Sequence, residues 1–173
     1  HGASILILNL NLNLNLNLNL NLILIPTQFR IFPIGQTIRP MKKIEHLGIA
    51  VKDLEASKLL FEKLLNTPCY KEEQVDSEKV TTAFFRNGPN KIELLAPIGG
   101  EGPIQKYLDK KGEGIHHIAI AVDDIYKEKE RLENEGFICL NEEPKEGADN
   151  KLVCFFHPKS TNGVLIELCM DKS

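Results

Sequence analysis

The chain has 173 residues, of which 42% are hydrophobic and 26% are charged, and its formal net charge is -3. This composition is typical of a globular protein that buries a core, and the acidic balance gives no general attraction for nucleic acid. The negative net charge does not exclude a polyanionic small ligand, because binding such a ligand needs only a local cluster of Lys or Arg. The cysteines form no C-x-x-C pair and are expected to be reduced core thiols of a cytoplasmic protein. Disulfides are the alternative, although the cysteine spacing indicates no particular pairing.

Residues 1–40 differ from the rest of the chain. Asn and Leu alternate strictly from Asn9 to Leu22, a low-complexity pattern that is prone to β-aggregation. The segment lacks the basic and unbroken apolar regions of a signal peptide, and Asn at every second position excludes a transmembrane helix. We expect residues 1–40 to be disordered or not native, with Met41 as the true start; the alternative is a genuine extra strand or arm.

An internal repeat organises the remainder. The segment Ile44–Leu54 reappears as Ile115–Ile125, and Ile92-Glu93-Leu94 reappears as Ile166-Glu167-Leu168. The two motifs occur in the same order in both halves, and the distance along the chain from the first motif to the second is nearly the same. This indicates a duplicated module.

Each module is predicted to contain a strand, a helix and three further strands. In module one, about 43–97, Asp53 is the expected N-cap and Gly88-Pro89-Asn90 the expected turn. Its elements are a strand at 43–51, a helix at 54–65 and strands near 68–75, 79–86 and 91–96.

Module two, about 115–171, follows a short linker helix at about 103–110. Asp123 or Asp124 is its expected N-cap, and Gly136 is the expected helix stop. Its elements are a strand at 115–122, a helix to about Glu135 and strands near 137–141, 151–157 and 163–170. The expected fold class is α+β, with two tandem βαβββ modules in one curved mixed sheet and helices on its outer face.

Strand alternation separates two kinds of face. One face of each leading strand is apolar and should pack on the helices; these residues are Leu47, Ile49 and Val51, and Ile118, Ile120 and Val122. The opposite faces carry His46 and His117 among small residues. This arrangement leaves space beside each imidazole, as a concave site requires.

A curved sheet would bring both histidines together with Glu93 and Glu167. Two imidazoles and two carboxylates suit one divalent metal ion, with Co, Zn, Mn and Ni as candidates. The alternative without a metal is that each His is a hydrogen-bonded core residue and each Glu is a solvated surface residue. The duplication of the pattern favours the metal site. His116 is interpreted as a structural or supporting residue, and His157 as a turn residue.

These motifs resemble the vicinal oxygen chelate (glyoxalase-like) superfamily, and the second half is similar to methylmalonyl-CoA epimerases. In the first half the resemblance rests on His46–Val51 and Ile92–Pro97. In the second half it rests on Gly114–Ile125, Asn141–Pro144, Phe156–Lys159 and Gly163–Leu168. It covers essentially all of residues 41–171 and none of 1–40.

The resemblance implies interconversion of (R)- and (S)-methylmalonyl-CoA by proton transfer at the carbon alpha to the thioester, with a metal stabilising the enolate. It implies His46, His117 and Glu167 as ligands, and Glu93 as a fourth or water-linked ligand. An acyl-CoA substrate, a cytoplasmic location and a homodimer are expected, without nucleic-acid or membrane partners.

One position departs from the family pattern. Some members carry a catalytic Glu in the third strand of module one, where this chain has Thr82. Glu93, Glu167 or a water would then transfer the proton. For the CoA phosphates, Lys145, Lys151 and Lys159 are candidates, and ordinary surface lysines are the alternative.

Other functions fit part of the pattern. A glyoxalase I-type lyase uses a similar set of two His and two Glu, although the tail from Glu142 to Leu168 favours the epimerases. An extradiol-type dioxygenase would use two His and one carboxylate. A sequestering protein of the same fold would not need the complete ligand set.

Overall fold

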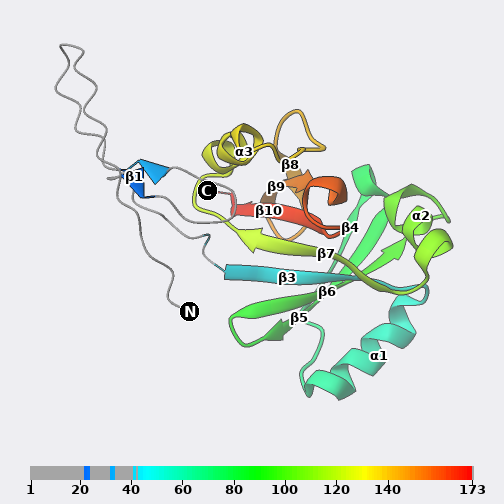
Figure 1. Ribbon diagram of the computed structural model, residues 1–173. Coiled ribbons are helices and arrows are strands. Elements are labelled where there is room, and N and C mark those ends of the chain that lie inside the picture. Colours follow the sequence, from blue (N-terminus) through cyan, green and yellow to red (C-terminus); the bar gives the residue numbers. More distant parts are fainter. Residues whose placement is uncertain (1–21, 24–31, 34–40, 42, 173) are drawn as a thin grey trace, which may run out of the picture. The chain divides into compact units, whose positions relative to one another are not determined.

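The computed structural model describes residues 22–23, 32–33, 41 and 43–172 (Figure 1). The chain divides into two compact units, His1–Pro40 and Met41–Ser173. In the first, strand β1 (Leu22–Ile23) pairs antiparallel with β2 (Phe32–Pro33). The expectation about the Asn/Leu repeat falls on residues that, apart from Leu22, lie outside the described part.

The second unit is built on a single sheet of eight strands with the order β4-β5-β6-β3-β7-β10-β9-β8. Module one contains β3 (Lys43–Ala50), α1 (Leu54–Leu65), β4 (Lys71–Val75), the 3-10 turn η1 (Asp76–Glu78), β5 (Val80–Asn87) and β6 (Asn90–Pro97). After α2 (Gly102–Lys111), module two contains β7 (Gly114–Ala121), α3 (Ile125–Asn134), β8 (Lys145–Gly147), β9 (Lys151–Phe156), η2 (Pro158–Ser160) and β10 (Leu165–Asp171).

The two modules meet at their leading strands. Strand β3 pairs antiparallel with β7, and each pairs in parallel with the last strand of its own module, β6 or β10. This topology confirms the predicted α+β fold of two repeated modules in one mixed sheet. It also brings the four strands that carry the candidate ligands to the centre of the sheet.

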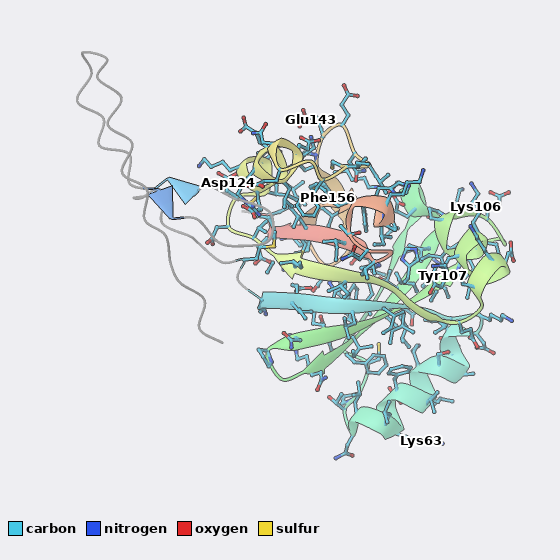
Figure 2. All side chains as sticks on the ribbon, viewed as in Figure 1. Lys63, Lys106, Tyr107, Asp124, Glu143 and Phe156 are labelled. Atoms are coloured by element: carbon cyan, nitrogen blue, oxygen red, sulfur yellow. The ribbon has the colours of Figure 1, made fainter. Side chains whose placement is uncertain are left out.

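The helix boundaries follow local capping chemistry. The Asp53 carboxylate accepts a hydrogen bond from the Ala56 backbone N–H at 3.0 Å, and Asp124 accepts one from Lys127 at 3.1 Å. Of the two predicted caps for α3, the structure therefore selects Asp124, which lies at the start of that helix in Figure 2. Gly136 follows the helix end with a φ of 89°, as the stop signal predicted.

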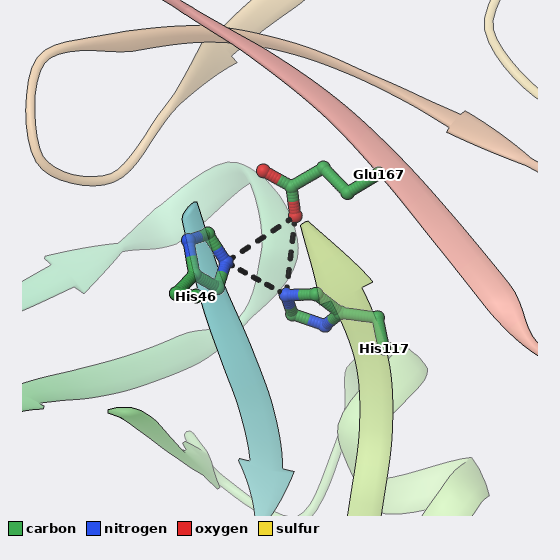
Figure 3. Close-up of side chains that lie close together, drawn as sticks. All are labelled: His46, His117 and Glu167. Carbon is green, nitrogen blue, oxygen red and sulfur yellow. Dashed lines mark hydrogen bonds and ion pairs between the residues drawn. The ribbon is translucent and has the colours of Figure 1, made fainter. Parts of the chain in front are cut away.

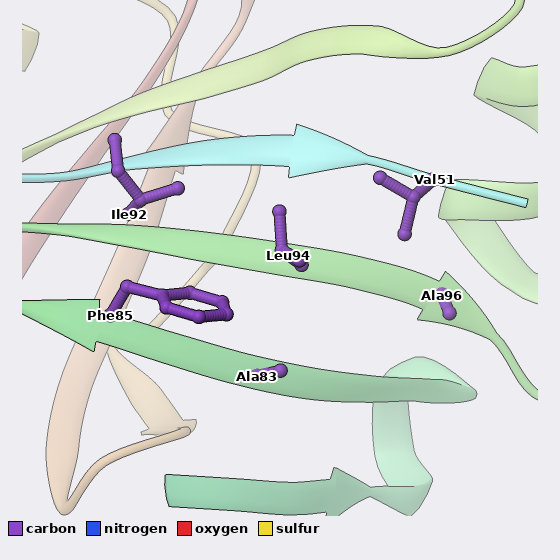
Figure 4. Close-up of a cluster of buried hydrophobic side chains, with 6 residues drawn as sticks. All are labelled: Val51, Ala83, Phe85, Ile92, Leu94 and Ala96. Carbon is purple, nitrogen blue, oxygen red and sulfur yellow. The ribbon is translucent and has the colours of Figure 1, made fainter. Parts of the chain in front are cut away.

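The core forms between the outer face of the sheet and the helices. In module one it consists of Val51, Ala83, Phe85, Ile92, Leu94 and Ala96 (Figure 4), against which Leu47, Ile49 and α1 side chains pack. In module two it consists of Val122, Ile125, Leu132, Cys154, Phe156 and Leu168, with Ile120 beside them. These clusters confirm the apolar faces expected of the two leading strands; Ile118 instead lines a surface pocket beside Tyr107 of α2.

Helix α2 packs differently from α1 and α3. Its Ile104 and Leu108 side chains contact a cluster of Ala50, Val80 and Leu95. Val80 and Leu95 also line the cavity described below. The linker helix therefore covers one end of the concave face, whereas α1 and α3 cover the outer face.

One predicted strand was wrong. Residues 137–141 form only an isolated bridge between Cys139 and Phe156, and the third strand pairing in module two is made by β8. The Asn141 side-chain oxygen accepts from the Phe155 backbone N–H at 2.8 Å, and Pro144 has no N–H to continue a ladder. The apolar run at residues 137–141 therefore forms one β-bridge and does not continue as a strand.

Among the described residues, no helix combines the length and the apolar character needed to cross a membrane. All four cysteines are free, and Cys154 and Cys169 are buried.

Candidate metal centre

The two histidines face each other across the central strand pair. His46 lies on β3 and His117 on β7, and their Nε2 atoms are 2.9 Å apart. Gly48 stands opposite His117 in the ladder, and a Cβ atom there would lie 2.2 Å from His117 Cε1. The absence of a side chain at Gly48 therefore creates the space that this imidazole occupies.

Two carboxylates reach the same point from the flanking strands. Glu167 on β10 places Oε2 3.2 Å from His117 Nε2 and 3.7 Å from His46 Nε2 (Figure 3). Glu93 on β6 places Oε2 3.2 Å from His46 Nε2 and 3.5 Å from His117 Nε2. The ligand atoms of His46, His117 and Glu167 all lie within 4.8 Å of one another. Glu93 contacts both imidazoles but stands outside that three-residue group.

All four side chains are buried, which alters their electrostatics. Burial would lower the pKa of His46, but the Glu93 charge and hydrogen bonds with Glu167 and Glu45 outweigh it and hold this pKa well above its usual value. Burial would raise the pKa of Glu93, yet the nearby His46 and His117 lower it to about 2. Glu93 is therefore an ionised, buried carboxylate.

The donor set fits a divalent cation. Within the described part of the chain, neither Glu93 nor Glu167 forms an ion pair with Lys or Arg, and both instead contact the two imidazoles. Two buried carboxylates and two convergent imidazole nitrogens are costly without a cation between them. Nitrogen and oxygen donors of this kind suit Zn, Co, Mn or Ni.

A cavity of about 70 Å³ adjoins the four residues. Its walls include apolar side chains from both modules, namely Val75, Val80, Phe84, Leu95, Val153 and Phe155. Thr82 also lines it, is only 1% exposed and donates from its hydroxyl to the Glu73 backbone oxygen at 3.3 Å. Thr82 therefore lies at the cavity and contributes no carboxylate to it.

The structure separates the three candidate lysines. Lys145 lines the cavity, forms an ion pair with Glu78 and lies over the Phe155 ring at 5.7 Å. Lys151 also lines the cavity but is buried and pairs with Asp171. Lys159, in η2, is not among the cavity-lining residues.

Among the described residues, two further histidines, His116 and His157, have distinct surroundings. His157 caps η2, where its Nδ1 accepts from the Lys159 backbone N–H at 3.0 Å, as a turn residue would. His116 places Nδ1 3.0 Å from Nδ1 of His117 and packs edge-on against Tyr107. Burial and the neighbouring His117 lower the pKa of His116 to about 4.

Glu45 was missed by the sequence analysis. It is 3% exposed, lines the cavity and places Oε2 2.5 Å from His46 Nδ1. Burial would raise its pKa, but hydrogen bonds with His46 and Lys91 outweigh burial and hold the pKa below the usual range. Strict strand alternation assigns Glu45 and His46 to opposite faces, so the period-two pattern contained no signal for this contact.

Comparison with known proteins gives consistent matches. The family model described as the glyoxalase/bleomycin resistance protein/dioxygenase superfamily matches residues 45–155. The ethylmalonyl-CoA/methylmalonyl-CoA epimerase of Cereibacter sphaeroides is 40% identical over 128 residues, covering 73% of this chain and 96% of that protein.

Two solved structures share the fold. Methylmalonyl-CoA epimerase from Mycobacterium tuberculosis superposes with a TM-score of 0.75 at 30% identity, covering 81% of this chain and 95% of that one. A variant of the Streptomyces coelicolor methylmalonyl-CoA epimerase, in complex with 2-nitronate-propionyl-CoA, superposes with a TM-score of 0.73 at 28% identity, covering 78% of this chain and 97% of that one.

Proposed function

Because this chain belongs to the methylmalonyl-CoA epimerases of the glyoxalase/bleomycin resistance protein/dioxygenase superfamily, we propose that it interconverts (R)- and (S)-methylmalonyl-CoA. The observation that carries the proposal is the convergence of two imidazoles and two carboxylates beside a buried cavity. A relative of the same family is known with an acyl-CoA analogue, which supports an acyl-CoA substrate here.

In this proposal His46, His117 and Glu167 hold one divalent metal ion, with Glu93 as a fourth or water-linked ligand. The ion, when bound, supplies positive charge where negative charge develops on the thioester oxygen during proton removal. The apolar cavity walls limit water around the reacting carbon and strengthen each electrostatic interaction there.

The chain's own carboxylates move the proton. One carboxylate takes the proton from the alpha carbon, and an acid on the opposite side of the substrate returns a proton to the other face. Thr82 has only a hydroxyl and cannot serve as the base, so Glu93 and Glu167 are the proposed catalytic pair.

The adenosine and phosphate portions of CoA exceed the size of the cavity and must extend beyond it. Lys145 is the best placed of the three lysines to meet them, because it lies at the cavity while only partly buried. Lys151 and Lys159 remain candidates for the same role. Charge reversal at each lysine, read out as the KM for methylmalonyl-CoA, checks this assignment.

The test of the proposed function is proton exchange. The protein is incubated with (R)- or (S)-methylmalonyl-CoA in deuterium oxide, with and without a chelator, and deuterium at the alpha carbon is measured by mass spectrometry. We expect exchange with the untreated protein, loss with chelator and recovery when Co²⁺ is restored.

A parallel assay with methylglyoxal and glutathione distinguishes the glyoxalase I-type alternative. Turnover there, without deuterium exchange in methylmalonyl-CoA, would replace the epimerase proposal. Exchange that persists after complete metal removal would refute the metal dependence alone.

A further inference from the structure

The residue before each candidate ligand histidine lies at an irregularity of the β3–β7 ladder. Ile44 pairs with Ile120 and His46 pairs with Ala119, so Glu45 has no partner in the ladder. Gly48 pairs with His117 and Ile49 pairs with Ile115, so His116 has none either. Each is the additional residue of a β-bulge, a feature that redirects side chains and is enriched beside functional sites.

These bulges give both histidines an Nδ1 partner. In a regular strand, adjacent side chains point to opposite faces and do not meet. Here Glu45 Oε2 lies 2.5 Å from His46 Nδ1, and His116 Nδ1 lies 3.0 Å from His117 Nδ1. The same backbone irregularity therefore places a supporting group behind each imidazole, on the side away from the shared Nε2 atoms.

We propose that Glu45 and His116 are positioning residues, which keep the ring proton of His46 and His117 on Nδ1 and so direct both Nε2 lone pairs to one metal ion. A carboxylate held by two lysines accepts, so His46 Nδ1 donates to Glu45, and Nε2 is the nitrogen that would give up its proton to bind a metal ion. In the second pair His117 Nδ1 donates and His116 Nδ1 accepts. This role rests on the metal site of the proposed function.

The carboxylate of Glu45 is itself held in place. Its Oε1 atom lies 2.5 Å from Lys91 Nζ and 3.5 Å from Lys151 Nζ. Lys91 continues to Asp149, whose Oδ2 lies 2.6 Å from the same ammonium. Glu45 therefore presents a fixed negative charge to His46, whereas the partner of His117 is an imidazole. Carboxylate partners raise the basicity of a ligand imidazole, so His46 is the more strongly supported ligand.

Metal affinity and ring protonation test this role without relying on catalysis. Co²⁺ is titrated into the metal-free full-length protein and its visible absorption gives the dissociation constant. We expect Glu45→Gln and His116→Leu each to raise that constant about 10- to 100-fold, the usual effect of losing an outer-shell partner. In the zinc-loaded wild type, proton–nitrogen NMR should show Nε2 of both histidines bound to metal and Nδ1 protonated.

Glu78→Gln is the matched control, because Glu78 is another cavity-lining carboxylate paired with a lysine but contacts neither histidine. It should keep the Co²⁺ affinity of the wild type. Thermal unfolding of each metal-free variant identifies any that fail to fold, and His116→Gln, which restores an acceptor, should recover part of the affinity lost in His116→Leu.

Three results would overturn the inference. The first is that Glu45→Gln and His116→Leu bind Co²⁺ as tightly as the Glu78→Gln control. The second is that the metal binds to Nδ1 of His46 or His117. A wild type that binds no Co²⁺ refutes both this role and the metal site, whereas a wild type that binds Co²⁺ but shows no deuterium exchange refutes only the epimerase proposal.

Discussion

The proposed reaction needs a second group that transfers a proton, and the positions of Thr82 and Glu93 bear on which residue supplies it. Thr82 lies at the cavity with only a hydroxyl, and this hydroxyl is already directed to the Glu73 backbone oxygen. Glu93 is ionised, buried and in contact with both imidazoles, although it stands outside the group of His46, His117 and Glu167. In the proposed metal site, this position would leave Glu93 able to act as a base while the other three residues hold the ion.

The substitution Glu93→Gln separates these roles. We expect Gln to keep metal binding, because its carbonyl oxygen can still reach the ion, and to slow deuterium exchange from one epimer by about 10²- to 10⁴-fold, the usual contribution of a general base. Exchange from the opposite epimer should persist. The measurement is exchange from each pure epimer, with Co²⁺ affinity measured alongside.

Glu167→Gln is the comparison, since it lies inside the three-residue ligand group and should weaken metal binding as well as exchange. Wild-type exchange from both epimers in Glu93→Gln would exclude Glu93 as a base.

At the scale of the element, the turn between β8 and β9 joins the two modules at the cavity. Asp149 and Asn150 have φ values of 53° and 57°, a conformation that costs energy for residues other than Gly. Contacts with module one hold this turn: the Asp149 carboxylate meets Lys91 at 2.6 Å and Lys71 at 3.2 Å, and its backbone N–H donates to Glu73 at 3.0 Å. Two ion pairs and one backbone hydrogen bond to module one therefore hold this turn.

Replacing Asp149 with Asn should release this turn and lower the free energy of unfolding by roughly 1–2 kcal/mol at neutral pH. Burial would raise the pKa of Asp149, but Lys91 and Lys71 outweigh it and lower the pKa. A lowered folded pKa stabilises the protein above the unfolded value near 3.9, and this contribution is lost as pH falls through the folded value.

The difference between wild type and Asp149→Asn in urea unfolding should therefore be present at pH 7 and shrink on acidification below about pH 4. Asp124→Asn is the control, because Asn also caps helices and Asp124 contacts only its own helix. A difference between wild type and Asp149→Asn that does not change with pH would contradict the ion-pair explanation.

At the scale of the whole molecule, the site exists only when both modules are folded and paired. Each module supplies one histidine and one carboxylate, and the β3–β7 pairing joins them. If the proposed site binds a metal ion, we therefore expect that ion to stabilise the complete sheet, because the unfolded chain lacks a preformed site.

Addition of Co²⁺ at about one hundred times its dissociation constant should stabilise the fold by about 2.7 kcal/mol. For a domain of this size, we expect the Tm to rise by about 5–10 °C, and EDTA to reverse the rise. His117→Ala should show no rise, and an equal rise in that variant would place the metal elsewhere. The homodimer and the cytoplasmic location stay predictions, which sedimentation and cell fractionation would test.

The sequence by itself determined the features that depend on local pattern and duplication. The internal repeat located the two modules and identified His46 and His117 as equivalent positions. Periodicity located helices and strands within each module, and Asp53 and Gly136 marked helix ends. These inferences succeeded because side-chain period and capping act within a few residues of the chain.

Only the tertiary structure decided how the strands align. Ladder bulges turned Glu45 and His116 toward His46 and His117, and the pairing of β9 with β8 replaced the strand expected at 137–141. It also brought Lys91 and Asp149 together from different modules. The physical reason is that register and bulges depend on hydrogen bonds to a partner strand, which the period of a single strand does not encode.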